Sequence, residues 1–214
     1  MRVAIAGGHG QIALRLATVL SQRGDEAVGL IRNPDHADDV RQAGAEPAVV
    51  DLEHASEDAV AQAIAGSDAV VFAAGAGPGS GAERKQTMDY GGAVKLIAAA
   101  KQAGVSRYVI VSSMGADPDA RGDDTFSVYL RAKGRADDAV RTSGLDATVV
   151  RPGRLTNNAG TGRVNLGESV PRGQVTRDDV VAVLAAVLDS PNTIGRTVDL
   201  IGGDTPVAEA VEAI

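Results

Sequence analysis

The sequence predicts a single α/β domain in which a doubly wound parallel sheet is covered by helices on both faces. Short apolar runs alternate with longer amphipathic stretches, which is typical of repeated βαβ units. Glycines follow the amphipathic stretches, at places where helices commonly end. The 214 residues suffice for one sizeable core, and no repeat, low-complexity tract or linker divides them.

Six apolar runs are expected to form the strands of the main sheet. Aromatic residues make up only 2 % of the chain, so the core consists mainly of Ala, Val, Leu and Ile, which suits strands buried on both faces. The expected strands are Val3–Ala6, Ala27–Ile31, Ala48–Val50, Ala69–Ala73, Arg107–Val111 and Ala147–Arg151.

Amphipathic stretches between these runs are expected to be helices. A residue in the left-handed conformation that closes a helix is least costly as glycine. The stretches cover 11–22, 35–43, 56–65, 83–103 and 126–143, and the glycines that follow them are Gly24, Gly44, Gly66, Gly104 and Gly144.

The alternation weakens after Arg151. Thr176 precedes a further apolar stretch and two aspartates follow it, which is the pattern of a capped helix N-terminus. We expect the single domain, 1–214, to carry small substrate-pocket elements within 152–176. The remaining elements expected are a loop at 152–163, a strand at Arg163–Leu166, a helix near 177–189 and a strand around Val198–Ile201.

Composition excludes several classes of function. The net charge of −7 offers no broad cationic surface for nucleic acid or anionic lipid. The chain has no cysteine and only three scattered histidines, so no metal centre is expected. The N-terminal apolar run is too short for a signal peptide and no stretch approaches 18 apolar residues. We therefore expect a cytoplasmic protein that binds neither nucleic acid nor membrane.

The first turn between strand and helix has the form of a dinucleotide-binding loop. It reads Ala6-Gly7-Gly8-His9-Gly10-Gln11-Ile12-Ala13, directly after a strand and directly before a helix. Either Gly7 or Gly8, together with Gly10 and Ala13, fits the spacing that lets backbone amides approach a pyrophosphate. The alternative is a glycine-rich turn that binds a mononucleotide or no ligand.

Arg32 at the end of the second strand favours NADP(H) over NAD(H). An acidic residue at this place would accept a hydrogen bond from a ribose hydroxyl, whereas an arginine suits a 2′-phosphate. The alternative is a solvated arginine at a strand end.

With these motifs the chain resembles the short-chain dehydrogenase/reductase superfamily, in particular its atypical NAD(P)H-binding branch, which looks like extended-type epimerases/dehydratases shortened at the C-terminus. The resemblance implies a Rossmann-like fold. It depends on the glycine loop, Arg32, Asp51-Leu52, Ala73-Ala74-Gly75, Met88-Asp89-Tyr90-Gly91-Gly92, Ser112-Ser113, Tyr129-x-x-x-Lys133 and Arg151-Pro152-Gly153.

The resemblance also implies where a dinucleotide binds. Asp51 and Leu52 are expected beside the adenine, Ala74 and Gly75 beside its ribose, and Pro152-Gly153 near the nicotinamide. His9 is expected to contact or cover the phosphates, or to fill the turn. The full set of expected cofactor-binding residues is Gly7, His9, Gly10, Gln11, Ile12, Arg32, Asn33, Asp51, Leu52, Ala74, Gly75, Ser112, Lys133, Pro152 and Gly153.

Tyr129 and Lys133 are the candidate catalytic pair. Four residues apart in a helical stretch, they share one face, and an adjacent ammonium lowers the pKa of a phenol toward the range of proton exchange. Ser113, or Ser112 beside it, could hydrogen-bond a substrate carbonyl at the end of a central strand. Asp89 replaces the helical Asn that is usual in the family's proton relay.

The reaction these residues imply is hydride transfer between the nicotinamide C4 and a carbonyl carbon, with Tyr129 exchanging the proton on oxygen. We expect an NADP(H)-dependent reductase, or an epimerase/dehydratase, for a small carbonyl compound in a pocket formed by 114–125 and 153–175. The alternative is a non-catalytic NADP(H)-binding redox sensor, in which Tyr129 and Lys133 would be an ordinary helix pair. The chain is expected to be a monomer or a homodimer.

Overall fold

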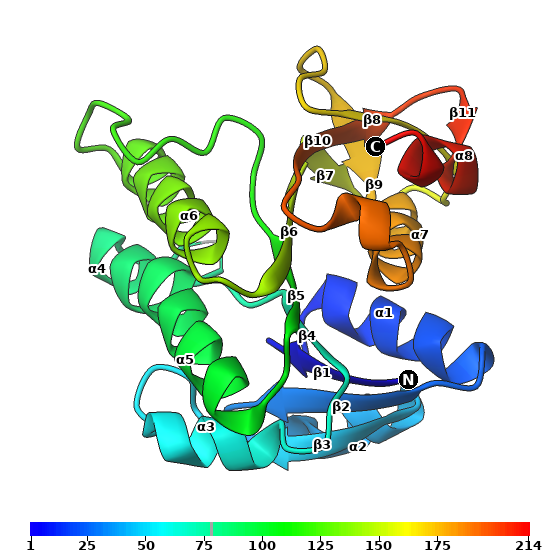
Figure 1. Ribbon diagram of the computed structural model, residues 1–214. Helices are drawn as coiled ribbons and strands as arrows, with labels where there is room; N and C mark the ends of the chain where they lie inside the picture. The colour runs from blue at the N-terminus through cyan, green and yellow to red at the C-terminus, as the bar shows by residue number, and fades with distance from the viewer. Residues whose placement is uncertain (78) are drawn as a thin grey trace.

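Nine strands form one mostly parallel sheet in the computed structural model, which describes residues 1–77 and 79–214 (Figure 1). Their order across the sheet is β11-β8-β10-β6-β5-β4-β1-β2-β3. Only the pairings of β8 with β10 and with β11 are antiparallel. The strands are β1 (Arg2–Ala6), β2 (Glu26–Ile31), β3 (Ala45–Val49), β4 (Ala69–Phe72), β5 (Arg107–Val111), β6 (Asp146–Pro152), β8 (Arg163–Gly167), β10 (Thr197–Gly202) and β11 (Thr205–Pro206).

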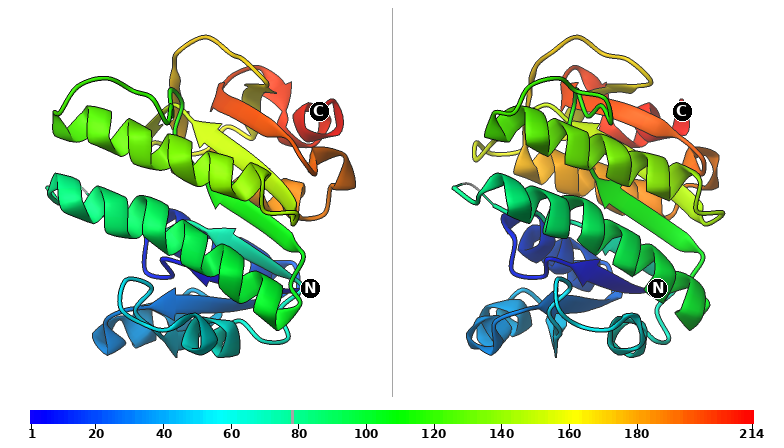
Figure 2. Two further views of the ribbon diagram at one scale, coloured as in Figure 1. Left: turned by 60° about the vertical axis from the view of Figure 1, so that its left-hand side comes forward. Right: turned by 90° about the vertical axis from the view of Figure 1, so that its left-hand side faces the viewer.

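Helices cover both faces of this sheet, as the sequence predicts. In Figures 1 and 2, α5 and α6 run side by side on one face, while α1 and α7 lie on the other. The α-helices are α1 (Gln11–Gln22), α2 (Ala37–Gln42), α3 (Glu57–Ala63), α4 (Ala82–Arg84), α5 (Ala93–Ala103), α6 (Thr125–Arg141), α7 (Arg177–Leu188) and α8 (Val207–Glu212), with short 3₁₀ turns at Pro34–His36 and Pro191–Thr193 and a π-helical turn η2 at Lys85–Gly92.

Two apolar cores result, one on each face of the sheet. Because successive strand residues point to opposite faces, Val3 and Ile5 of β1 pack toward α1 and α7, while Ala4 and Ala6 pack toward α3 and α5. Tyr108, buried in the second core, donates its hydroxyl to the Ala93 carbonyl oxygen at 3.2 Å. Both cores consist mainly of Ala, Val, Leu and Ile, as the low aromatic content predicts, with Phe72 and Tyr108 as aromatic residues of the second.

The direction of strand succession reverses at β1. This strand pairs with β2 on one side and β4 on the other, so that Ile5 lies between Gly29 and Val71. In open α/β sheets, ligands bind beyond the carboxyl ends of the strands at such a reversal. The topology thus confirms the doubly wound, Rossmann-like arrangement and marks the edge where a site is expected.

Several elements differ from the sequence-based expectation. The third strand begins at Ala45 rather than Ala48, with Glu46 and Pro47 inside it. This is possible because β3 is an edge strand, where a missing backbone N–H is tolerated. The stretch 83–103, expected as one helix, contains the π-helical turn η2 before α5.

The C-terminal part contains short elements that the sequence did not indicate. A separate two-stranded parallel sheet pairs β7 (Arg154–Thr156) with β9 (Gln174–Thr176), and β11 and α8 follow the last expected strand. The expected cap of α7 is present, since Thr176 Oγ1 accepts a hydrogen bond from the Asp179 backbone N–H at 3.0 Å. Asp179 in turn accepts backbone N–H groups of Thr161 and Gly162, which holds the preceding loop against the helix.

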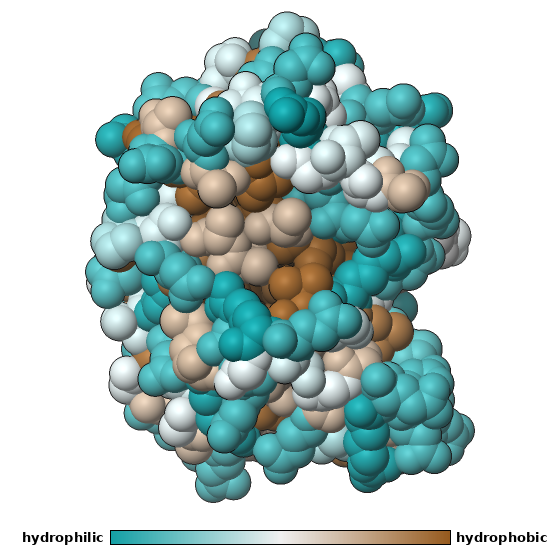
Figure 3. All heavy atoms as spheres, turned by 90° about the vertical axis from the view of Figure 1, so that its right-hand side faces the viewer, coloured by the Kyte–Doolittle hydropathy of each residue, from teal (hydrophilic) through white to brown (hydrophobic). Residues whose placement is uncertain are grey.

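The outer surface is mostly polar. Figure 3 views the side of the molecule that lies to the right in Figure 1, and apolar side chains gather in a hollow near its centre with hydrophilic residues around them. Within residues 1–77 and 79–214, no helix combines the length and apolar character needed to cross a bilayer.

Candidate functional site

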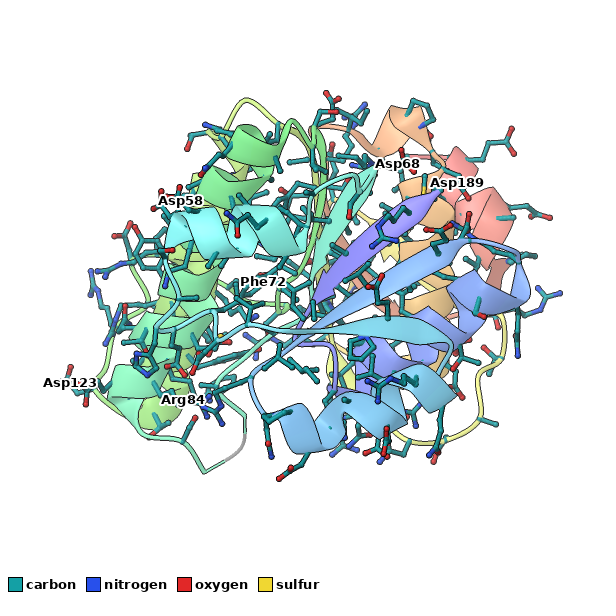
Figure 4. All side chains as sticks on the ribbon, turned by 90° about the horizontal axis from the view of Figure 1, so that it is seen from below. Asp58, Asp68, Phe72, Arg84, Asp123 and Asp189 are labelled. Atoms are coloured by element: carbon teal, nitrogen blue, oxygen red, sulfur yellow. The ribbon has the colours of Figure 1, made fainter. Side chains whose placement is uncertain are left out.

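Three adjoining hollows lie along the carboxyl edge of the parallel strands. Figure 4 shows Arg84 and Asp123 toward this edge and Asp68 and Asp189 toward the opposite one. We name the hollows by the element that borders each: the α1 hollow of about 440 Å³, the α6 hollow of about 730 Å³ and the β7 hollow of about 400 Å³. The α1 and α6 hollows share Ala73, Ala74, Gly75 and Gly77 in their linings, so they adjoin along this strip, and we call the two together the trough.

The glycine loop forms one wall of the α1 hollow and fits too closely against the sheet for side chains. A Cβ on Gly7 would lie 2.7 Å from Ala74 Cα, and one on Gly8 would lie 2.7 Å from Gly29 Cα. Gly7 also has φ of +80°, which favours glycine. Gly7 brings the loop against the residues that follow β4, and Gly8 brings it against β2. The spacings that begin at Gly7 and at Gly8 therefore both have a structural reason.

The N-terminus of α1 is left free to bind an anion. Its first residue is preceded by Gly10, which offers no side-chain cap, and its first turn holds no acidic residue. By contrast, Ser56, Asp124 and Thr176 cap α3, α6 and α7 with their side chains. Uncapped N–H groups and the positive end of the helix dipole suit a phosphate. The residues present therefore fit the pyrophosphate of a dinucleotide.

The outer end of the α1 hollow carries two guanidinium groups around one carboxylate. Arg84 Nε donates to Glu53 Oε2 at 3.0 Å, and Arg32, whose side chain is 56 % exposed, lies 3.6 Å from the same oxygen. Burial alone would raise the pKa of Glu53, but the hydrogen bond from Thr87 and the charge of Arg84 hold that pKa below its ordinary value. The group of three keeps a net positive charge beside the hollow.

Two stacked imidazoles lie on the same hollow. The rings of His9 and His36 are 3.6 Å apart at an angle of 14°, and His9 Nε2 is 2.7 Å from Asp39 Oδ2. Both histidines line the α1 hollow. The stack forms part of the wall between the glycine loop and the strand end that carries Arg32.

Most of the other residues expected to bind the dinucleotide near the glycine loop and the strand ends line the α1 hollow, and Gln11 does not. Asn33 and Asp51 use a side-chain oxygen to accept the backbone N–H two residues on, so they shape their own turns. Gln11 is exposed and lines none of the three hollows. The α1 hollow is lined by Gly7, His9, Gly10, Arg32, Asn33, Asp51, Leu52, Ala74 and Gly75 of the expected set.

The α6 hollow contains Tyr129 and Lys133, brought to one face of α6 by their spacing. The Lys133 ammonium is buried, donates to the Val111 carbonyl oxygen at 3.1 Å and lies 3.4 Å from Asp89 Oδ1. It lies 5.9 Å from the centre of the Tyr129 ring. Lys133 is thus fixed in place beside a half-buried phenol that borders the hollow.

Asp89 holds this arrangement from the π-helical turn. Its side chain is 1 % exposed, and Oδ2 accepts the Ala76 backbone N–H at 3.1 Å. Gly75 packs closely above it, because a Cβ there would lie 3.1 Å from Asp89 Oδ1. Asp89, which stands where the resembling family usually has Asn, therefore links the wall between the hollows to the ammonium of Lys133.

The two serines after β5 face different surroundings. The Ser112 hydroxyl is fully buried and makes no well-formed hydrogen bond within the part of the chain described. It lies close enough to Asp137 to oppose the rise in the pKa of that carboxyl group. Ser113 lines the β7 hollow, and its Oγ has only a long 3.4 Å contact with the Met114 carbonyl oxygen. Ser112 also lines the α6 hollow, but its hydroxyl is buried, whereas the Ser113 hydroxyl borders the β7 hollow without a short hydrogen bond.

Beside the end of β5, an ion pair joins α6 to β6. Arg151 Nε donates to Asp137 Oδ2 at 2.8 Å, and the Asp137 side chain is fully buried. Burial raises the pKa of Asp137 above its ordinary value, although Ser112 and Arg151 oppose the rise. The pair holds α6 against β6 beneath the hollows.

Several residues that border the site were not indicated by the sequence, and three of them carry a charge or an exposed aromatic ring. Arg84 lies on the α1 hollow, Lys85 on the α6 hollow and Phe126 between the α6 and β7 hollows. Arg84 and Lys85 come from a stretch that reads as ordinary amphipathic helix, and Phe126 from the first turn of α6. No spacing or motif distinguishes them from surface residues.

The chain is similar to nicotinamide-dinucleotide proteins over almost its whole length. Residues 7–191 match a family model described as NAD(P)H-binding. A Bacillus subtilis protein named "Uncharacterized sugar epimerase YhfK" is 37 % identical over 215 residues, with 100 % of both chains covered. The solved structure "Putative NAD-dependent epimerase/dehydratase from Bacillus halodurans" is 40 % identical with a TM-score of 0.92 and 100 % of both chains covered. The oxidoreductase YlbE from Lactococcus lactis is 25 % identical with a TM-score of 0.86, and 100 % of this chain and 96 % of that one are covered.

Proposed function

Because the chain belongs to the NAD(P)H-binding family, we propose that it is an NADP(H)-dependent oxidoreductase acting on a small carbonyl compound or the corresponding alcohol. The observation that carries the proposal is the placement of Tyr129 and Lys133 on the α6 hollow, which adjoins the α1 hollow along Ala73, Ala74 and Gly75. A dinucleotide lying in this trough would reach from the glycine loop to the phenol.

The residues that would hold the dinucleotide follow from the lining of the trough. The glycine loop and the free N-terminus of α1 would bind the pyrophosphate, and the strand ends near Asp51 and Ala74 would border the adenosine. Lys133 would bind the nicotinamide ribose, with Pro152 and Gly153 nearby. When bound, the nicotinamide supplies or accepts a hydride at C4.

NADP(H) is preferred in this proposal because positive charge gathers where a 2′-phosphate would lie. Arg32 and Arg84 flank the single carboxylate of Glu53, and an arginine fork matches the geometry of phosphate oxygens. Arg84 thus adds a second cation to the one expected from the sequence. A net charge of +1 in this group favours the phosphorylated dinucleotide.

The chain's own part in the chemistry is proton exchange and orientation. The Tyr129 hydroxyl would give a proton to the carbonyl oxygen of the substrate, or take it from the alcohol in the reverse direction. Lys133 is held beside this phenol by Asp89 and Val111. Ser113, whose hydroxyl is free, would donate a hydrogen bond to the same carbonyl oxygen from the side of the β7 hollow.

The substrate would enter from the β7 hollow. Its lining includes Pro152, Gly153, Arg154 and Arg172, all within the region 152–176 that we expected to hold substrate-pocket elements. Phe126, 64 % exposed, borders both this hollow and the α6 hollow. A substrate passing between them would contact this ring.

A Tyr129→Phe variant tests the proposal. NADPH binding, measured by calorimetry, is expected to equal that of the wild type, because the ring is kept and only the hydroxyl is lost. NADPH oxidation in the presence of a panel of small aldehydes and ketones is expected to fall by about a hundredfold or more. Unchanged oxidation by the variant would remove Tyr129 as proton donor. Binding of NADPH without turnover of any carbonyl by the wild type would favour the redox sensor instead.

A further inference from the structure

We propose that Lys85 forms a binding subsite for a carboxylate group of the substrate, within the α6 hollow. The assignment rests on the proposed function, since Tyr129 fixes where the reacting carbonyl would lie. It makes the substrate an oxo acid, or the corresponding hydroxy acid, with a mainly apolar body.

The first observation is a largely buried lysine that borders the hollow and whose ammonium is partly buried. The Lys85 residue is 8 % exposed, lines the α6 hollow and lies with Nζ 5.5 Å from the centre of the Tyr129 ring. Among residues 1–77 and 79–214, its one hydrogen bond is donated to the Gly77 carbonyl oxygen at 2.9 Å. An ammonium has three donors, so two are left for a ligand.

The second observation is that this charge has no counterion. Across residues 1–77 and 79–214, no carboxylate forms an ion pair with Lys85, whereas the neighbouring Lys133 is paired with Asp89. The α6 hollow therefore holds two ammonium groups and one carboxylate. Keeping an unpaired charge out of water is unfavourable, and an anionic group of a ligand would offset that cost.

The π-helical turn η2 accounts for the position of Lys85. Lys85 and Asp89 both line the α6 hollow from this turn. Asp89 is engaged by Lys133 and the Ala76 N–H, so it is not available to neutralise Lys85. Such turns are rare and often occur at functional sites.

The surroundings of Lys85 favour a carboxylate over a phosphate. A phosphate is usually bound by an arginine fork or by several convergent donors, whereas a single ammonium suffices for a monoanion. The rest of the lining includes Ile12, Val111, Phe126 and Leu155, which suit an apolar body beside the charged group.

Benzoate and benzamide serve as matched probes, because they share shape and differ in charge. Ligand-observed NMR titrations would use protein saturated with NADPH, so that the free helix N-terminus of the cofactor site cannot bind the anion. The variants are Lys85→Met, Lys85→Arg and, as a control, Lys101→Met, which removes an exposed lysine of α5. NADPH affinity of each variant is measured separately by calorimetry.

We expect benzoate to bind the wild-type complex at least about tenfold more tightly than benzamide, and Lys85→Met to lose about tenfold or more in benzoate affinity alone. Lys85→Arg, which keeps a cation, should still prefer benzoate to benzamide, and Lys101→Met should keep benzoate affinity within about twofold. Equal affinity of Lys85→Met and wild type for benzoate, or no benzoate binding by the wild-type complex, would overturn the assignment while leaving NADPH binding intact. Failure of the wild type to bind NADPH would instead overturn the proposed function.

Discussion

Asp89 and Lys133 form a buried ion pair, with Oδ1 and Nζ 3.4 Å apart and side chains only 1 % and 5 % exposed. The pair joins the π-helical turn η2 to α6, and Asp89 also binds the Ala76 N–H in the wall between two hollows. Fold stability and the position of the candidate catalytic lysine therefore depend on the same carboxylate.

Replacing Asp89 by Ala should lower the free energy of unfolding by about 3 kcal/mol, because Lys133 is left buried and unpaired. Urea unfolding followed by circular dichroism measures this. Asp89→Asn, which keeps an oxygen to accept the Ala76 N–H, should lose less. An unchanged unfolding midpoint in Asp89→Ala would show that another group can neutralise Lys133.

Replacing Arg32 by Ala should weaken NADPH binding by about tenfold or more and leave NADH binding nearly unchanged, since only the phosphorylated ribose needs the guanidinium. Fluorescence titration with both dinucleotides measures the ratio. Arg41→Ala provides the control, because Arg41 is exposed on α2 and pairs with Asp38. If the wild type binds both dinucleotides equally, the role given to Arg32 is wrong.

Glu53 should make stability depend on pH in the acid range. Burial would raise its pKa, but Thr87 and Arg84 outweigh burial and hold the folded-state pKa below the ordinary value of 4.5. Since the folded state binds the proton less readily, this stabilisation is complete above about pH 4.5 and is lost as the pH falls through the lower, folded-state pKa. Unfolding free energies of wild type and Glu53→Gln should therefore differ at pH 7 and converge as the pH falls below the folded-state pKa of Glu53. A difference that is constant with pH would contradict the assignment.

Replacing Thr176 by Ala should lower the free energy of unfolding by about 1 kcal/mol, because α7 loses its cap and Asp179 loses one of its partners. Thr176→Ser should keep nearly full stability, since the hydroxyl remains. Thr142→Ala, at an exposed position after α6, should change stability by less than about 0.5 kcal/mol. Thermal unfolding of the three variants distinguishes the cap from a general effect of losing a threonine.

The sequence predicts the fold well because each principal element has a local signal. Apolar runs mark β1, β2, β4, β5 and β6, and a glycine lies within three residues of the end of α1, α5 and α6. The family is confirmed by the match over residues 7–191. The start of β3 is misjudged because Glu46 and Pro47 are unusual in a strand, and only its place at the edge of the sheet permits them.

The candidate site is only partly predictable, because its less obvious residues depend on tertiary packing. Tyr129 and Lys133 share a helix face, so their spacing is informative. That the Ser112 hydroxyl is buried while Ser113 borders a hollow follows from the packing of the strand end against distant parts of the chain. Lys85 is distinguished only by a π-helical turn and a missing counterion, and neither leaves a pattern in the sequence.

The wall shared by the α1 and α6 hollows has a consequence for protein engineering. At 73–75 it consists of two alanines and a glycine, so no side chain there is larger than a methyl group. A larger side chain at any of these three positions would change the shape of the α1 hollow and of the α6 hollow at the same time. Libraries meant to alter substrate choice should therefore keep this strip fixed and randomise Arg172, which lines the β7 hollow alone.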